Sequence, residues 1–162
     1  MANAYYEKNI LGELSDAQTL PSTASEDSEN MVYIGGPTGG QLWINVYANN
    51  AIVIVTGKLF YIELEGWTSD VAANATSPFS ITNSGGANHA TGILEDNAHY
   101  WLLHKTTGDA ELQFDAGDLI TQCAIPEDMF RLLGYDYVQL RYETDDNESS
   151  ERVDAFVWIK PS

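Results

Sequence analysis

The sequence predicts an all-β protein, a jelly-roll or Greek-key β-sandwich with one short helix and an extended N-terminal arm. Residues 41–66 form the densest apolar block of the chain, and their apolar side chains mostly recur every second residue, which is the period of a β-strand. Further short apolar stretches follow, separated by turns rich in Gly and Asn. Strands do not alternate with long helical segments in the sequence, so a parallel α/β sheet is not expected.

Three strands are predicted within this apolar block. Residues 41–48 and 59–65 alternate between two faces, whereas residues 51–55, AIVIV, are apolar throughout, which favours a central strand covered on both faces. Asn49-Asn50 and Gly57-Lys58 are typical of the turns between them. Amide and charged side chains interrupt the block, so it is not a membrane span.

The rest of the chain divides into an arm and one domain. Residues 1–30 are predicted to be an extended arm, because apolar pairs such as Tyr5-Tyr6 and Ile10-Leu11 are isolated in a polar segment. Residues 31–162 are predicted to be a single sandwich domain. Within it, residues 126–133 are the one expected helix, since Pro and acidic residues suit a helix start.

The C-terminal part of the chain contains two further alternating segments. Residues 138–142 and 153–159 each place apolar side chains on one face, and the acidic stretch 144–152 separates them. This pattern predicts a closing hairpin with an exposed tip.

The charge of the chain excludes several classes of partner. With 24 acidic and 7 basic residues, the formal net charge is −17. Nucleic acid and anionic membranes are therefore not expected partners, because both require clustered Lys and Arg. The charge suits a soluble, self-repelling surface or a partner with a basic face.

The search for catalytic groups finds no convincing constellation. Glu63 and Glu65 are two residues apart on one predicted strand, which gives a separation of about 6.6 Å and is compatible with a glycosidase pair. Such pairs are expected by chance among 24 acidic residues, so we predict no enzyme.

Metal and thiol chemistry are also not expected. His89, His99 and His104 lack metal-ligand spacing, and Cys123 lies in an apolar run without a neighbouring base. We predict no cofactor and no metal, although the loop Asp145–Glu148 carries oxygen ligands that suit weak cation binding.

Aromatic side chains provide the candidate binding surfaces. Trp43, Tyr47 and Trp158 lie on strand faces opposite the aliphatic ones, and a sheet that is apolar on both faces needs a second cover. We therefore predict a subunit contact there. Trp67 and Trp101 are the candidates for an alternative, sugar-binding surface.

The order of motifs along the chain carries a family resemblance. The first motif is Leu14-Ser15-Asp16-Ala17-Gln18, which precedes a polar Ser/Thr-rich stretch. A short strand ending in Gly (Met31 to Gly35) and a strand beginning Leu59-Phe60-Tyr61-Ile62 follow. The last motifs are Ile125-Pro126, which leads through Arg131-Leu132-Leu133 into residues 137–142, and a final strand Val153 to Ile159. This order resembles the jelly-roll capsid cement (decoration) proteins of tailed phages. The chain departs from the usual pattern in its longer acidic arm and its Trp-rich middle.

The resemblance implies a structural function in the virion. Such a protein would be made in the host cytoplasm, assemble as a homo-oligomer (dimer or trimer), and bind the outer surface of the capsid, where it bridges major capsid protein subunits. Its contacts are expected at Tyr5, Tyr6, Ile10 and Leu11 of the arm and at Trp43, Tyr47 and Trp158 of the domain. The alternative is a carbohydrate-binding β-sandwich module.

Overall fold

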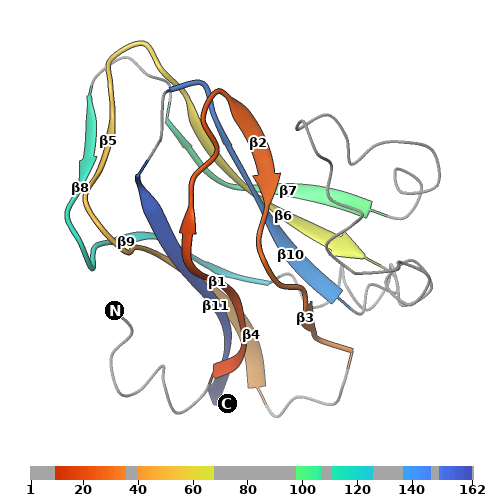
Figure 1. The fold of residues 1–162 in the computed structure, drawn as a ribbon. Coiled ribbons are helices and arrows are strands. Elements are labelled where there is room, and N and C mark those ends of the chain that lie inside the picture. Colours follow the sequence, from red (N-terminus) through yellow and green to blue (C-terminus); the bar gives the residue numbers. More distant parts are fainter. Residues whose placement is uncertain are drawn as a thin grey trace.

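Two antiparallel sheets and a small ribbon make up the described part of the chain (Figure 1). The computed structural model describes residues 10–35, 40–67, 98–106, 111–125, 137–146 and 150–161. The strands are β1 (Ile10–Thr19), β2 (Ala24–Asp27), β3 (Val32–Tyr33), β4 (Gly40–Ala48), β5 (Ile52–Ile54), β6 (Phe60–Trp67), β7 (Ala98–Thr106), β8 (Leu112–Phe114), β9 (Leu119–Ala124), β10 (Tyr137–Thr144) and β11 (Arg152–Pro161).

The all-β sandwich is confirmed, and none of the described ranges contains a helix. The segment predicted to be helical, residues 126–133, lies outside the described residues. Where the chain is described, no helix is long and apolar enough to cross a membrane.

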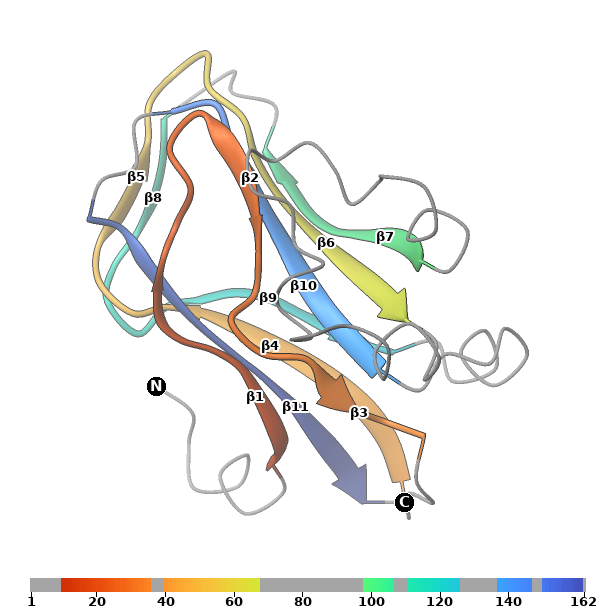
Figure 2. The ribbon, with the colours of Figure 1, turned by 45° about the vertical axis from the view of Figure 1, so that its right-hand side comes forward.

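Each sheet combines strands from both ends of the chain. The first, called the β1 sheet, has the order β1-β11-β4-β9, and the second, the β2 sheet, has the order β2-β10-β6-β7 with β3 also pairing with β10. Figure 2 shows the two sheets side by side. Interleaving of early and late strands across two packed antiparallel sheets is the arrangement of a jelly roll.

The aliphatic faces of the two sheets meet in one core. Alternate residues of the central strands are buried there, as the two-residue period predicted: Leu42, Ile44, Val46, Val153, Ala155 and Val157 from the β1 sheet, and Phe60, Ile62, Leu64, Val138, Leu140 and Tyr142 from the β2 sheet. Burying each large aliphatic side chain contributes roughly 1.5–3 kcal/mol, so this inner face determines which way every strand is turned.

Two of the strand predictions are wrong in their pairing. Residues 51–55 contain β5, whose partner among the described strands is β8, and Val53 and Val55 are about 40% exposed instead of lying in a covered central strand. β10 and β11 do not form a hairpin, because they lie in different sheets. The spacing of apolar residues along a strand predicts which side chains are buried, but it does not predict which other strand pairs with it.

The predicted arm is also shorter than expected. Residues 10–27 form β1 and β2, which pair with β11 and β10, and only residues 1–9 lie outside the described residues at this end. The error has a physical cause: β1 buries Ser15 and Gln18, whose polar side chains are hydrogen-bonded, so the apolar alternation that marks a strand is weak there.

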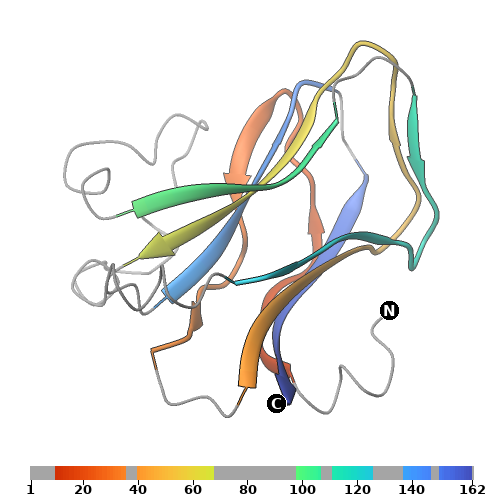
Figure 3. The ribbon, with the colours of Figure 1, turned by 180° about the vertical axis from the view of Figure 1, so that it is seen from behind.

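Contacts with the second sheet cover the free edge of β1. The amide of Asn30 donates to the carbonyl of Leu14 (2.9 Å), and the amide of Glu29 donates to Oε1 of Gln18 (2.9 Å). Gly12 lies so close to Val32 that an added Cβ would be 2.9 Å from both Val32 methyl groups. β9 and β7 are the edge strands on the opposite side (Figure 3). Covering an edge in this way blocks unwanted strand addition at β1.

Candidate functional site

The outer face of the β1 sheet carries a cluster of aromatic side chains. β4 and β11 turn their aliphatic residues inward, so the alternate residues Trp43, Tyr47, Phe156 and Trp158 share the opposite face. We call these four residues the aromatic cluster. The prediction that Trp43, Tyr47 and Trp158 lie opposite the aliphatic side chains is therefore met by the strand register.

The rings pack in two cross-strand pairs. The ring centroids of Trp43 and Trp158 are 6.1 Å apart, and those of Tyr47 and Phe156 are 5.9 Å apart with nearly parallel planes. Nζ of Lys160 lies 5.5 Å from the centroid of a Trp43 ring, within the range of a cation–π contact. These pairs stabilise β4 against β11 on the face away from the core.

A buried amide lies in the middle of the aromatic cluster. Oδ1 of Asn45 accepts hydrogen bonds from Nε1 of Trp158 (2.9 Å) and from Nε2 of Gln122 (3.0 Å), and its Nδ2 donates to the hydroxyl of Tyr47 (3.0 Å). Asn45 is fully buried. It thus orients two rings of the cluster, a function that the sequence analysis missed although Asn45 has the same two-residue spacing.

Exposure differs sharply among the predicted contact residues. Tyr47 is 7% exposed and Trp158 is 4% exposed within the single chain, whereas Ile10 and Leu11 are about 40% exposed and Trp43 is half-buried. Ile10 is the register partner of Trp158, which in turn is the partner of Trp43. Ile10 and Trp43, on either side of the buried Trp158, are therefore the more accessible members of this row. Tyr5 and Tyr6 lie outside the described residues.

A group of polar side chains lies on the outer face of the β2 sheet. Asp27 of β2, Glu65 of β6 and Gln139 of β10 are all buried. Asp27 is the register partner of Arg141, and Glu65 is the partner of Gln139. Asp27 and Glu65 belong to the two strands that flank β10, and Glu65 acts on the protonation of Asp27.

Burial dominates the protonation of this group. It raises the pKa of Asp27 to about 6, against the opposing effects of the Glu65 hydrogen bond and the Arg141 charge, while Glu26 raises it further. Burial also raises the pKa of Glu63, and Arg141 opposes that shift. The predicted pair Glu63 and Glu65 therefore contributes to a network with Asp27 and Arg141, which the sequence analysis had not connected.

Two residues of the acidic loop considered for a cation, Asp145 and Asp146, make structural contacts. A carboxylate oxygen of Asp145 accepts a hydrogen bond from the amide of Leu59, and one of Asp146 accepts from the amide of Val55 at 2.9 Å. Both residues thus hold the connection between β5 and β6. Residues 147–149 lie outside the described residues.

The tryptophans of the alternative sugar site occupy different rows of the β2 sheet. Trp67 is the register partner of Tyr137, whereas Trp101 is the partner of Leu64, a core residue. An aromatic pair does lie beside this position: the rings of Tyr33 and Tyr137 are 5.3 Å apart, and Tyr33 is 52% exposed.

Of the residues considered for metal and thiol chemistry, the structure describes the strand positions of three. Cys123 is a free, partly buried thiol on β9, opposite Ile44. His99 and His104 are positions of β7, and His89 lies outside the described residues. Across the described ranges, no three His, Cys, Asp or Glu side chains are arranged to hold a metal ion.

Comparison of the chain with protein-family models, with curated proteins and with solved structures finds no match.

Proposed function

We propose that the protein is a capsid cement subunit, a structural virion protein that binds the outer face of a tailed-phage capsid and bridges major capsid protein subunits. The observation that carries the proposal is the convergence of Ile10, Trp43 and Trp158 in one row on the outer face of the β1 sheet. These residues are far apart in sequence, and none of them is needed to fill the core between the sheets.

An interface function explains the composition of this face better than stability alone. Ile10 and Leu11 at the start of β1 are about 40% exposed and Trp43 of β4 is half-buried, in a chain whose net charge is −17. Such a local apolar surface on an otherwise self-repelling protein favours one specific contact over general association. Residues 1–9, with Tyr5 and Tyr6, precede β1 directly and would extend the contact.

Co-sedimentation with empty shells assembled from the major capsid protein of the same virus tests the proposal. Wild type is expected to saturate the shells, and Ile10→Asp with Trp43→Gln is expected to weaken binding by about tenfold or more, as loss of central apolar contacts does. Val53→Asp is the matched control, since Val53 is equally exposed but lies in the β5–β8 ribbon. Absence of shell binding, or equal loss in the control, would refute this function.

Light scattering addresses the oligomeric part of the proposal. A homo-oligomer in the concentrated protein is expected, and a strict monomer would count against bridging by a dimer or trimer. Because this measurement needs no capsid, it separates self-association from shell binding.

A carbohydrate-binding module is the second candidate, and the Tyr33–Tyr137 pair favours it. An aromatic pair with one exposed ring, that of Tyr33, suits stacking against a sugar ring, and Trp67 is the next register position in that row. Saturable glycan binding that is lost in Tyr33→Ala, together with no affinity for shells, would replace the capsid proposal with this one.

A further inference from the structure

The aromatic cluster is buried more deeply than the outer face of a sheet is by its own strands. Tyr47, Phe156 and Trp158 are 7%, 7% and 4% exposed, and they form a cluster separate from the core between the sheets. Trp43, in the same sheet, packs against these three residues. Neighbours within a sheet shield the edges of a ring, but its outward surface is shielded only by a second layer.

The described strands pack on the opposite side of this sheet. The β2 sheet meets its inner face, and the β5–β8 ribbon adds Ile52 and Ile54 to the same inner core. The low exposures of the cluster are reached within a single chain, so the chain itself supplies the outer layer. We propose that residues 1–9, which lie outside the described residues, form this layer in the free protein, with Tyr5 and Tyr6 as the apolar contact.

The position of β1 brings this segment to the cluster. Ile10 is the register partner of Trp158, and Phe156 is two residues farther along β11, or about 7 Å. Tyr5 and Tyr6 precede Ile10 by five and four residues, which an extended chain spans in at most about 18 Å. Both tyrosines can therefore reach the cluster. Tyr suits this position, because its ring packs while its hydroxyl stays in water.

The chemistry of the segment agrees with this placement. It has to turn back over the sheet before β1 begins, and Asn9 is a residue type that favours turns. Glu7 and Lys8 cancel in charge, so the segment brings no net charge to a face that carries Glu13 and Asp154 in register with two of the rings. Most other parts of this acidic chain would be repelled there.

Two other occupants fit the face less well. A second copy of the chain would bring another charge of −17 to it, and the rings are already buried within one chain. Residues 126–136 also adjoin this row, because they follow β9, but they have to end at β10 in the other sheet. The segment before β1 leaves Ile10 and the half-buried Trp43 accessible, so the inference goes beyond the proposed shell contact and does not depend on it.

Thiol labelling of Phe156→Cys tests the proposal, in a Cys123→Ser background that removes the native thiol. Labelling is expected to be at least about tenfold slower in the full chain than in a chain lacking residues 2–9, because burial of two aromatic side chains exceeds the free energy of a tenfold change. Val46→Cys, which faces the core, should stay unreactive in both chains and so reports that the shorter chain is folded. Val53→Cys, at an exposed position, should label rapidly in both.

Tyr5→Ser with Tyr6→Ser keeps the full chain length and decides the question if the shorter chain fails to fold. It is expected to accelerate the labelling of Phe156→Cys by about tenfold, whereas Asn3→Ser in the same segment should leave the rate unchanged. Fast labelling in the full chain, equal rates with and without residues 2–9, or no effect of the double Tyr substitution would each overturn the proposal.

The dependence of labelling on protein concentration separates the two sources of cover. A rate that is independent of concentration is expected for a segment of the same chain. Protection that rises with concentration would overturn the proposal in favour of a second copy. The assay contains neither shells nor glycans, so its failure is distinguishable from failure of the proposed function.

Discussion

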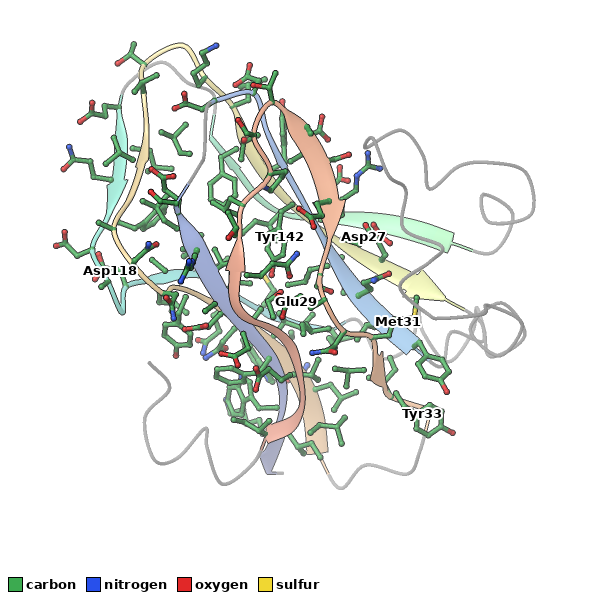
Figure 4. The ribbon with its side chains drawn as sticks, viewed as in Figure 1. Asp27, Glu29, Met31, Tyr33, Asp118 and Tyr142 are labelled. Atoms are coloured by element: carbon green, nitrogen blue, oxygen red, sulfur yellow. The ribbon has the colours of Figure 1, made fainter. Side chains whose placement is uncertain are left out.

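The hydroxyl of Tyr142 lies 2.9 Å from Oγ of Ser15, and this hydrogen bond joins β10 of the β2 sheet to β1 of the β1 sheet. Both residues are buried, and Ser15 also donates to Oε1 of Gln18 (2.7 Å). Gln18 in turn donates to the carbonyl of Asp27 (2.8 Å). The amide of Glu29 also donates to Gln18 (2.9 Å), and Figure 4 labels both Glu29 and Tyr142. A continuous polar chain therefore closes the sandwich where β1 and β2 meet.

Removing the hydroxyl should weaken this closure. Tyr142→Phe is expected to lower the free energy of unfolding by about 1–2 kcal/mol, the cost of losing one buried hydrogen bond. Urea denaturation measures it. Tyr33→Phe is the control, because Tyr33 is 52% exposed and should change stability by less than about 0.5 kcal/mol. Equal effects of the two substitutions would contradict a closing function for the Ser15–Tyr142 bond.

The amide of Asn45 should matter more than its size suggests. Asn45→Ala removes the acceptor for the Trp158 and Gln122 side chains and the donor to Tyr47. We expect a loss of roughly 2–4 kcal/mol, since several buried polar groups lose partners at once. Chemical denaturation followed by Trp fluorescence reports both stability and the environment of Trp158. Gln113→Ala, at an exposed position of β8, is expected to be nearly neutral. A neutral Asn45→Ala would show that the rings orient themselves.

We predict that position 12 must be Gly, because β1 and β3 approach each other closely there. An added methyl group would lie 2.9 Å from both methyl groups of Val32, so Gly12→Ala should cost about 1–3 kcal/mol through overpacking. The double variant Gly12→Ala with Val32→Ala checks the cause, because the shortened Val32 relieves the clash. Strict additivity of the two single effects in denaturation experiments would rule out the clash as the reason.

Asp27 should make stability fall as the pH rises, opposite to the usual behaviour of a paired carboxylate. Its pKa is about 6 in the folded protein against an ordinary value of 3.8, so the folded state favours the protonated form. The associated stability is fully present below pH 3.8 and is lost as the pH rises through about 6. The charged groups that act on it are Glu65, Arg141 and Glu26.

The matched substitution is Asp27→Asn. It should stabilise the protein at pH 7 by about 2–3 kcal/mol relative to wild type and have little effect at acidic pH, since a shift of two pKa units corresponds to that energy. Urea titrations across this pH range measure the difference. A gain that is independent of pH would exclude the proposed titration as its source.

The successes and errors of the sequence-based prediction have specific physical causes. The period of two in β4 and β11 predicted which side chains are buried between the sheets and that Trp43, Tyr47 and Trp158 share the other face. β1 escaped prediction because its buried Ser15 and Gln18 satisfy their polar groups by hydrogen bonds instead of being apolar. The effect of Glu65 on the protonation of Asp27 had no local signal, since β2 and β6 become neighbours of β10 only in the folded sheet.

The sequence by itself determined the all-β class, the strongly negative net charge and the side of each central strand that is buried. These properties follow from side-chain chemistry and from the two-residue period of a single strand. Only the tertiary structure decided that β10 and β11 belong to different sheets, that Asn45 organises the aromatic cluster, and that Asp27 and Glu65 lie on the two strands that flank β10. Strand pairing depends on long-range hydrogen bonds and packing, which no local pattern encodes.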